Sequence, residues 1–360
     1  MIFRIHDRYI LKQFLRVFFF SILSFTVIYV TVDVFEEIDN FIDHEAEYQH
    51  ILMFYVYSIP FILSYITPVS LLLASVFSMG VLGRRNELTA FIASGVSLLR
   101  LSSSILIAAF VVSLLSLVFN DLAVTKSNRM MDDIKHYEIE GRKRSDPFLK
   151  ENLYYLGENG IVYLAQRYNH RTKTLYDVVV QQFDENTLVR RIDAKRCFWR
   201  IDKWIFYQGF DRTFEDQNEN VIGFHELSLP GLAEKPDDFS KETIDQENMN
   251  FLQLRDYISK MTKSGGNVDK YMVDLYFKLS FPFAGWIFVL LGIAFASGKR
   301  KPSMATGFGL TLAISFLYYG ILRVGQTLGH NGVLPPLLAA QLGNVIFLAI
   351  GIFSLMRANR

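Results

Sequence analysis

The chain contains one cysteine, Cys197, among 360 residues. A single cysteine excludes an intramolecular disulfide and any metal cluster held by cysteines alone. The seven histidines are scattered, and neither an H-E-x-x-H pattern nor a G-x-S-x-G pattern is present. We therefore predict no catalytic residue and no metal site, because the residue groupings that such chemistry needs do not occur together.

The sequence also lacks a phosphate-binding loop of the form G-x-x-x-x-G-K-[ST]. The nearest stretch runs from Gly292 to Lys299, but five residues separate its two glycines, and Arg300 stands where Ser or Thr is needed. That stretch also ends an apolar run, whereas a phosphate-binding loop follows a strand. We therefore expect that this chain does not hydrolyse ATP by itself.

Charge is scarce, at 20% of residues with a net charge of +1, so no global field points to nucleic acid. Apolar residues make up 51% of the chain and gather in runs of about twenty, the length that crosses a bilayer core. Backbone groups in lipid must be hydrogen-bonded internally, so each run is expected to form a helix. The six runs are Val17–Val32, Ile51–Gly83, Leu101–Phe119, Leu279–Gly298, Ser303–Leu322 and Val333–Met356.

The short segments between the runs alternate in charge, and this alternation predicts the orientation. Segment Asp33–His50 holds seven acids and no Lys or Arg. The segments on the opposite side are basic, with Arg4, Arg8, Lys12, Arg16, Arg84, Arg85, Arg100, Lys299, Arg300, Lys301, Arg357 and Arg360. The positive-inside rule then places both termini in the cytoplasm and the long insert between the third and fourth runs outside.

That insert changes pattern from continuous apolar runs to short alternating segments separated by polar turns, which is typical of a β-sandwich or jelly roll. The expected strands are Asn152–Leu156, Ile161–Gln166, Leu175–Phe183, Leu188–Arg196, Trp204–Phe214 and Val221–Leu229. A helical stripe over 251–263 predicts an interfacial helix. We expect an α-helical membrane protein: residues 1–120 with three spans and a cytoplasmic helix at 84–100, a periplasmic domain at 121–269, and three spans at 270–360.

Two features stand out from this background. The turn after the second span, Arg84–Gly95, has small and apolar positions that suit a short helix packed in a groove, and the Glu87 carboxylate lies near the N-terminus of that helix, where the helix dipole favours it. Glu87 is equally consistent with a solvated charge in a turn. The second feature is Arg323 at the outer end of the fifth span, which either faces a lipid phosphate or extends to the headgroups.

Several short motifs, in this order and with this topology, resemble one family: the LptF/LptG permeases of lipopolysaccharide export. They are Asp7-Arg8-Tyr9, the turn Arg84–Gly95, Lys278 with Pro282, Leu291-Gly292-Ile293, Gly307–Gly309, Tyr318-Tyr319 and Leu328–Pro336. The acidic stretch Asp33–Asp39 is similar to the LptG half more than to the LptF half.

The resemblance implies a permease subunit of an ATP-binding-cassette transporter that extracts lipopolysaccharide from the outer leaflet of the bacterial inner membrane. Its implied partners are an LptF-like half, a cytoplasmic LptB-like ATPase dimer that binds ATP and Mg, and a single-span LptC-like protein with a periplasmic jelly roll. Glu87 falls where the family has its coupling glutamate, which favours the coupling role. The implied ATPase contact comprises Arg84, Arg85, Glu87, Leu88, Ala90, Phe91 and Gly95.

Some family members have lysines near the outer end of the first span, whereas this chain is acidic there. The candidate phosphate contacts are therefore Arg323, Lys126 and Arg129, and the candidate gate acids are Glu36 and Glu37. Two other functions are open: an ATPase-coupled transmitter or envelope-assembly scaffold that carries no lipid, and a membrane enzyme acting on envelope lipids. Lipid copurified with the complex would separate transport from scaffolding.

Overall fold

The computed structural model describes residues 5–141, 149–157, 160–184, 187–215, 218–229, 232, 234–240, 248–263, 267–297 and 303–358. Arg4, the Lys299-Arg300-Lys301 turn and Arg360, which entered the orientation argument, lie outside these residues. The chain divides into two compact units. One comprises Met1–Gly141, Glu247–Phe251 and Asp269–Arg360, and the other comprises Arg142–Gln246 and Leu252–Val268.

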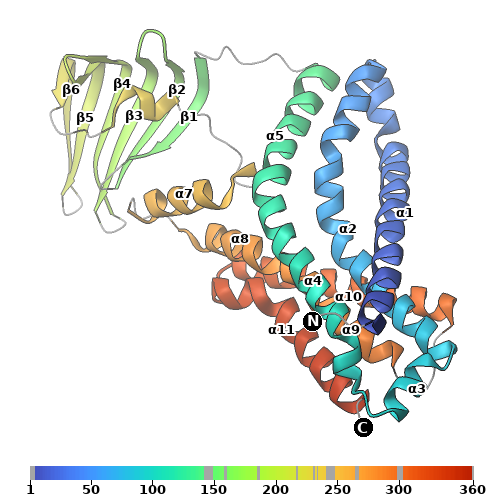
Figure 1. Ribbon diagram of the computed structural model, residues 1–360. Helices are drawn as coiled ribbons and strands as arrows, with labels where there is room; N and C mark the ends of the chain where they lie inside the picture. Colours follow the sequence, from blue (N-terminus) through green and yellow to red (C-terminus); the bar gives the residue numbers. More distant parts are fainter. Residues whose placement is uncertain are drawn as a thin grey trace. The chain divides into compact units, whose positions relative to one another are not determined.

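The first unit is helical, and within the described residues six of its helical segments are long and apolar enough to cross a membrane. The prediction of six spans is therefore confirmed. The segments are α1 (Ile5–Asp43), α2 (Tyr48–Arg84), α4 (Leu98–Phe119) continued by η1 (Asn120–Val124), α5 (Thr125–Asp133) and η2 (Ile134–Ile139), α8 (Asp269–Ser280) continued by η4 (Phe281–Phe283) and α9 (Ala284–Ala296), α10 (Met304–His330), and α11 (Pro336–Ala358) (Figure 1).

Small residues let these helices approach closely, as expected where lipid supplies no hydrophobic force between them. Gly292 of α9 lies against Ser75 of α2 so tightly that a Cβ there would be 1.8 Å from the serine Oγ. Gly325 and Gly329 of α10 lie in the same way against Ala339 of α11. These glycines therefore bring α9 close to α2 and α10 close to α11.

A chain of polar groups crosses this apolar core and satisfies its own hydrogen bonds. The Tyr318 hydroxyl donates to Asn344 Oδ1 at 2.9 Å, and Asn344 Nδ2 donates to the Ser280 carbonyl at 2.8 Å. The Ser280 hydroxyl donates to the Ala340 carbonyl at 2.9 Å. Unpaired polar groups are costly in lipid, so these bonds fix how α8, α10 and α11 are joined.

Helix α1 is the span least covered by the rest of the chain. Only 11% of its apolar window is buried, against 33% to 78% in the other five. Near its start, Ile10, Phe14 and Phe18 are buried at a spacing of four residues, and further along, Phe19 and Phe20 are more than half exposed. One stripe of α1 therefore packs inward, and a broad apolar face remains for lipid or another chain.

Within its described residues, the second unit contains six antiparallel strands in the sheet order β1-β2-β3-β4-β5-β6, so each strand pairs with its sequence neighbour (Figure 1). All six expected strands are present, and the prediction of a helical membrane protein with an inserted β domain is confirmed. The strands are β1 (Leu149–Leu156), β2 (Ile161–Asn169), β3 (Thr174–Asp184), β4 (Thr187–Arg200), β5 (Lys203–Glu215) and β6 (Asn218–Leu229).

The arrangement of these strands differs from the two stacked sheets of the expected sandwich. The described strands form one sheet, and Phe239 of α6 (Pro236–Ser240) packs on its buried face. The Phe239 ring meets Tyr163 at 5.1 Å and Trp204 at 5.4 Å between ring centroids, and all three side chains are buried. Alternation of apolar and polar residues along a strand shows that one face of the sheet is covered, but it does not show which part of the chain covers that face.

A short polar network anchors the same segment to the sheet. The Tyr163 hydroxyl donates to Glu234 Oε2 at 2.7 Å, and Trp204 Nε1 donates to the Glu234 carbonyl at 2.8 Å. Burial, together with the Glu234 carboxylate, raises the pKa of Tyr163. Cys197 is fully buried nearby in β4, and burial raises the pKa of its thiol.

A candidate coupling segment and an outer polar cluster

The turn between α2 and α4 contains α3, a helix of seven residues, Glu87–Ala93. It is shorter than the helix predicted over 84–100, because the chain breaks on both sides. Asn86 has a left-handed backbone with φ of 60° before α3, and Gly95 has φ of +86° after it. The Ser97 hydroxyl then caps α4 by accepting the Arg100 N–H at 3.3 Å.

Two side chains anchor α3 to the membrane unit. Leu88 is buried and belongs to a core shared with Ile10 of α1 and Leu98 of α4, and Phe91 packs against that core. The other predicted contact residues Arg84, Arg85, Ala90 and Gly95 are exposed. The segment also exposes Thr89, Ile92 and Ala93, which sequence reasoning did not single out. The result is a firmly seated helix whose outer face is small and apolar.

Glu87 lies at the first position of α3 with about a third of its side chain exposed. Its Oε1 is 3.8 Å from Arg85 Nη1, and Arg85 also donates to the Tyr9 hydroxyl at 3.5 Å. The ion pair is long and Arg85 is mostly exposed, so Arg85 holds the Glu87 carboxylate weakly.

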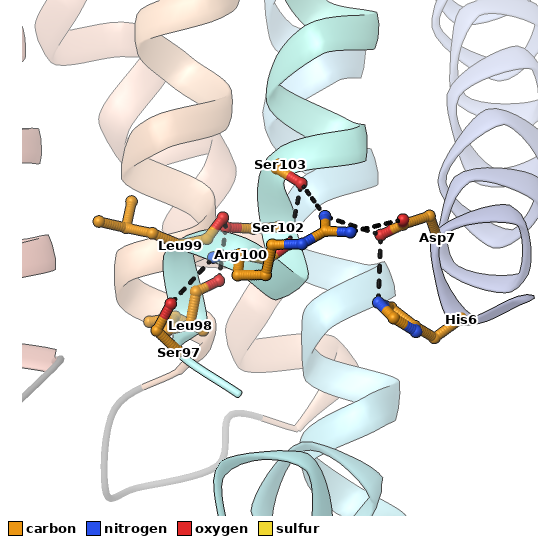
Figure 2. Close-up of polar contacts among 8 residues, drawn as sticks. All are labelled: His6, Asp7, Ser97, Leu98, Leu99, Arg100, Ser102 and Ser103. Carbon is orange, nitrogen blue, oxygen red and sulfur yellow. Dashed lines mark hydrogen bonds and ion pairs between the residues drawn. The ribbon is translucent and has the colours of Figure 1, made fainter. Parts of the chain in front are cut away.

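A more strongly held ion pair lies beside α3 and joins α1 to α4 (Figure 2). Arg100 donates to both carboxylate oxygens of Asp7, at 3.3 Å and 3.1 Å, and to the Ser103 hydroxyl at 2.9 Å. His6 Nε2 is 3.3 Å from the same carboxylate. Sequence reasoning used Asp7 only as part of a motif and Arg100 only as a positive charge. The signal was available, because Asp7 is an acid within a basic segment.

At the opposite end of α1, the predicted gate acids have different surroundings. Glu37 accepts from Lys135 Nζ of η2 at 2.8 Å and from Asn40 at 2.9 Å, whereas Glu36 is exposed. The Tyr55 hydroxyl of α2 donates to Asp33 at 3.0 Å. Two acids of α1 are thus tied to neighbouring helices, and Glu36 is accessible.

The predicted cations of α5 also differ from each other. Arg129 donates twice to the Asn248 carbonyl, at 3.0 Å from Nε and 2.9 Å from Nη2, and Asn248 Nδ2 donates to Asp132 at 2.6 Å. Lys126 is exposed. The Arg129 guanidinium therefore holds the chain where it returns toward the membrane helices, and Lys126 is the more accessible charge.

Arg323 lies on an exposed part of α10 and donates to Gln326 at 3.2 Å. Among the described residues, no ion pair joins Arg323 to Glu36 or Glu37, so the structure does not bring these candidates together within one chain. Within the same residues, no group of three His, Cys, Asp or Glu side chains is placed to hold a metal ion.

Comparison with known proteins gives a consistent result over nearly the whole chain. Residues 8–357 match the family described as the lipopolysaccharide export system permease LptF/LptG. The lipopolysaccharide export system permease protein LptG of Escherichia coli K12 is 21% identical over 320 residues, which cover 85% of each chain. LptG of Haemophilus influenzae is 20% identical over 350 residues, which cover 96% of each chain. With its six membrane-spanning segments and inserted β sheet, this chain therefore belongs to the LptF/LptG family of lipopolysaccharide export permeases and is a multi-pass inner-membrane protein.

Proposed function

We propose that this chain is one permease half, more like LptG, of an ATP-binding-cassette transporter. It extracts lipopolysaccharide from the outer leaflet of the inner membrane and passes it to a periplasmic bridge. The family match over residues 8–357 supports this proposal, as do the names of both relatives, which are LptG. The chain itself is not an enzyme in this scheme.

The coupling part of the proposal is supported by the way α3 packs against the membrane unit. Leu88 and Phe91 anchor this short helix to the core shared by α1 and α4, while Ala90 and Ile92 face outward. A rigid element with an accessible small-residue face suits a groove on another protein. We assign that groove to an LptB-like ATPase dimer, which binds the ATP and Mg, and Glu87 supplies a charge at the edge of the contact.

We assign the lipid path to the exposed apolar face of α1 and to the β unit. The apolar face of α1 is wide and exposed, which suits a cavity shared with an LptF-like half. The start of α1, α3 and the end of α11 lie at one end of the membrane unit (Figure 1). In the proposed orientation that end is cytoplasmic and the β unit is periplasmic, where it meets an LptC-like protein.

Arg323 and Lys126 are the proposed phosphate contacts, because both cations are exposed. A charge-assisted hydrogen bond contributes about 1.5–3 kcal/mol, which is enough to strengthen the binding of a lipid phosphate tenfold or more. The alternative for Arg323 is a side chain that merely extends to the headgroups. Glu36 is the accessible acid for a gate contact with the other half.

The proposal is tested by purifying the chain with its LptF-like and LptB-like partners and measuring bound lipopolysaccharide, ATP hydrolysis and lipid transfer. Glu87→Lys is expected to weaken ATPase binding or to lower lipid transfer per ATP. Asp39→Lys is the matched control, since it makes the same charge change at an exposed position at the far end of α1. Normal transfer by the Glu87 variant would remove that residue from coupling. A wild-type complex that hydrolyses ATP but holds no lipid would favour the scaffold function.

A further inference from the structure

The first turns of α1 contact the coupling segment at three successive places. The Tyr9 hydroxyl accepts from Arg85 after α2, and the His6 ring lies 5.8 Å from the Phe91 ring of α3, centroid to centroid. Asp7 then pairs with Arg100 at the start of α4. The segment from the end of α2 to the first turn of α4 therefore touches one short stretch of α1 at Arg85, Phe91 and Arg100.

The three contacts differ in strength. The Tyr9 contact is long at 3.5 Å, and the His6 contact is a tilted ring pair without a hydrogen bond. Asp7 is 1% exposed and accepts both N–H groups of the Arg100 fork, which the Ser103 hydroxyl also orients (Figure 2). A two-point contact between planar groups fixes direction as well as distance, and a buried carboxylate depends on its cation.

This pair matters because the apolar window of α1 is little covered by its own chain. That window is 11% buried, and the outer end of α1 is tied through Glu37 and Lys135 at 2.8 Å. The inward stripe of Ile10 and Phe14 shares its core with Leu88 of α3. A displacement of α3 therefore reaches α1 near Asp7, where packing and the ion pair coincide.

We propose that Asp7 and Arg100 form a positioning pair that makes α1 follow the coupling segment, so that ATP hydrolysis by the partner moves the first membrane span. The inference rests on the proposed function and extends it to residues outside the ATPase contact. Asp7 and Arg100 touch neither nucleotide nor lipid in this scheme. They act by transmitting motion from α3 to α1.

The test uses the full complex and measures lipid transferred per ATP hydrolysed. Asp7→Asn and Arg100→Gln are each expected to assemble, hydrolyse ATP and lower this ratio about tenfold. The double variant should lower it no further, because the two residues act through one contact. Arg100→Lys should fall between, since charge remains but the fork is lost. Arg16→Gln, an exposed arginine on the same helix, is the matched control and should leave the ratio unchanged.

An unchanged ratio in the single variants, or a double variant that falls about a hundredfold, would overturn the inference. If Asp7→Asn fails to assemble, Arg100→Lys decides, because a wild-type ratio there would show that the two-point contact is not needed. A purely structural role would lower assembly and hydrolysis together and leave the ratio of surviving complexes unchanged.

A second readout does not depend on lipid. A cysteine introduced at Ile28, which is 56% exposed on α1, carries a spin label in a Cys197→Ala background. Addition of ATP and vanadate should change the spectrum of the spin label in the otherwise unaltered complex and should leave the spectrum unchanged in the Asp7→Asn variant. An equal response in both would overturn the inference. A responsive label in a complex that transfers no lipid would refute the proposed function and leave the positioning pair standing.

Discussion

The contact between Gly292 and Ser75 allows a sharp test of how α9 is joined to α2, the helix that leads into α3. A Cβ added at Gly292 would lie 1.8 Å from Ser75 Oγ, 3.0 Å from Ser75 Cβ and 3.2 Å from the Leu72 carbonyl oxygen. The hydroxyl can rotate away only by leaving its 2.7 Å bond to that carbonyl. The contact with Ser75 Cβ remains after rotation, so Gly292→Ala must separate the two helices by a few tenths of an ångström.

Two effects of opposite sign set the magnitude. Replacing glycine by alanine inside a helix stabilises by about 0.8–1 kcal/mol, whereas overpacking a tight core costs about 1–3 kcal/mol. Gly320 of α10 is the matched control, because a Cβ there meets nothing within 4 Å and only the favourable effect applies. The two alanine variants should therefore differ in stability by about 1–3 kcal/mol, with Gly292→Ala the less stable.

The assay is thermal unfolding of the detergent-solubilised protein, followed by loss of the monodisperse species. Since 1 kcal/mol corresponds to roughly 2–4 °C in domains of 150–250 residues, Gly292→Ala should melt several degrees below Gly320→Ala. Adding Ser75→Gly to Gly292→Ala should recover part of the loss, because it removes both clashing atoms. Equal melting temperatures for the two alanine variants, or no recovery with Ser75→Gly, would refute the packing argument.

Three further predictions concern the β unit and α10. Tyr163→Phe removes the hydroxyl that donates to Glu234 and should destabilise the β unit by about 1–3 kcal/mol in thermal unfolding. The pKa of Tyr163 in the folded protein lies above its ordinary value of 10.0, so the stabilisation by this hydroxyl is complete below pH 10 and declines as the pH rises further. A melting temperature that does not fall above pH 10 would contradict this expectation. Buried Cys197 should resist maleimide until the protein is denatured. A cysteine introduced by Ile201→Cys, at a site 84% exposed, should react in intact cells only with reagent supplied from the periplasmic side. Labelling of that cysteine from the cytoplasm would reverse the proposed orientation. Arg323→Ala should lower copurified lipopolysaccharide tenfold or more and Arg323→Lys should retain part of it, while unchanged lipid in the alanine variant would leave headgroup contact as its role.

Much of the membrane unit followed from composition alone, for a physical reason. A segment that crosses lipid must be apolar over a fixed length and must satisfy its backbone internally, so six runs predict six helices without knowledge of their partners. The β strands followed in the same way, because a strand with one buried face alternates with a period of two. Both signals are local. The candidate coupling segment at Arg84–Gly95 was located by its basic turn and by the family resemblance, while the extent of its helix depended on the backbone at Asn86 and Gly95.

Only the tertiary structure revealed the contacts between residues that lie far apart in the chain. Nothing local pairs Asp7 with Arg100, 93 positions away, or joins Arg129 to the Asn248 carbonyl, 119 positions away. The contact of Phe239 with the buried face of the described strands was decided in the same way, because it joins segments distant in the chain. Periodicity along one element reports that a face is buried, whereas the identity of the buried partner is set by packing among all elements at once. The local sequence pattern by itself therefore determined which segments cross the membrane and which form strands, and three-dimensional packing decided which charges hold them together.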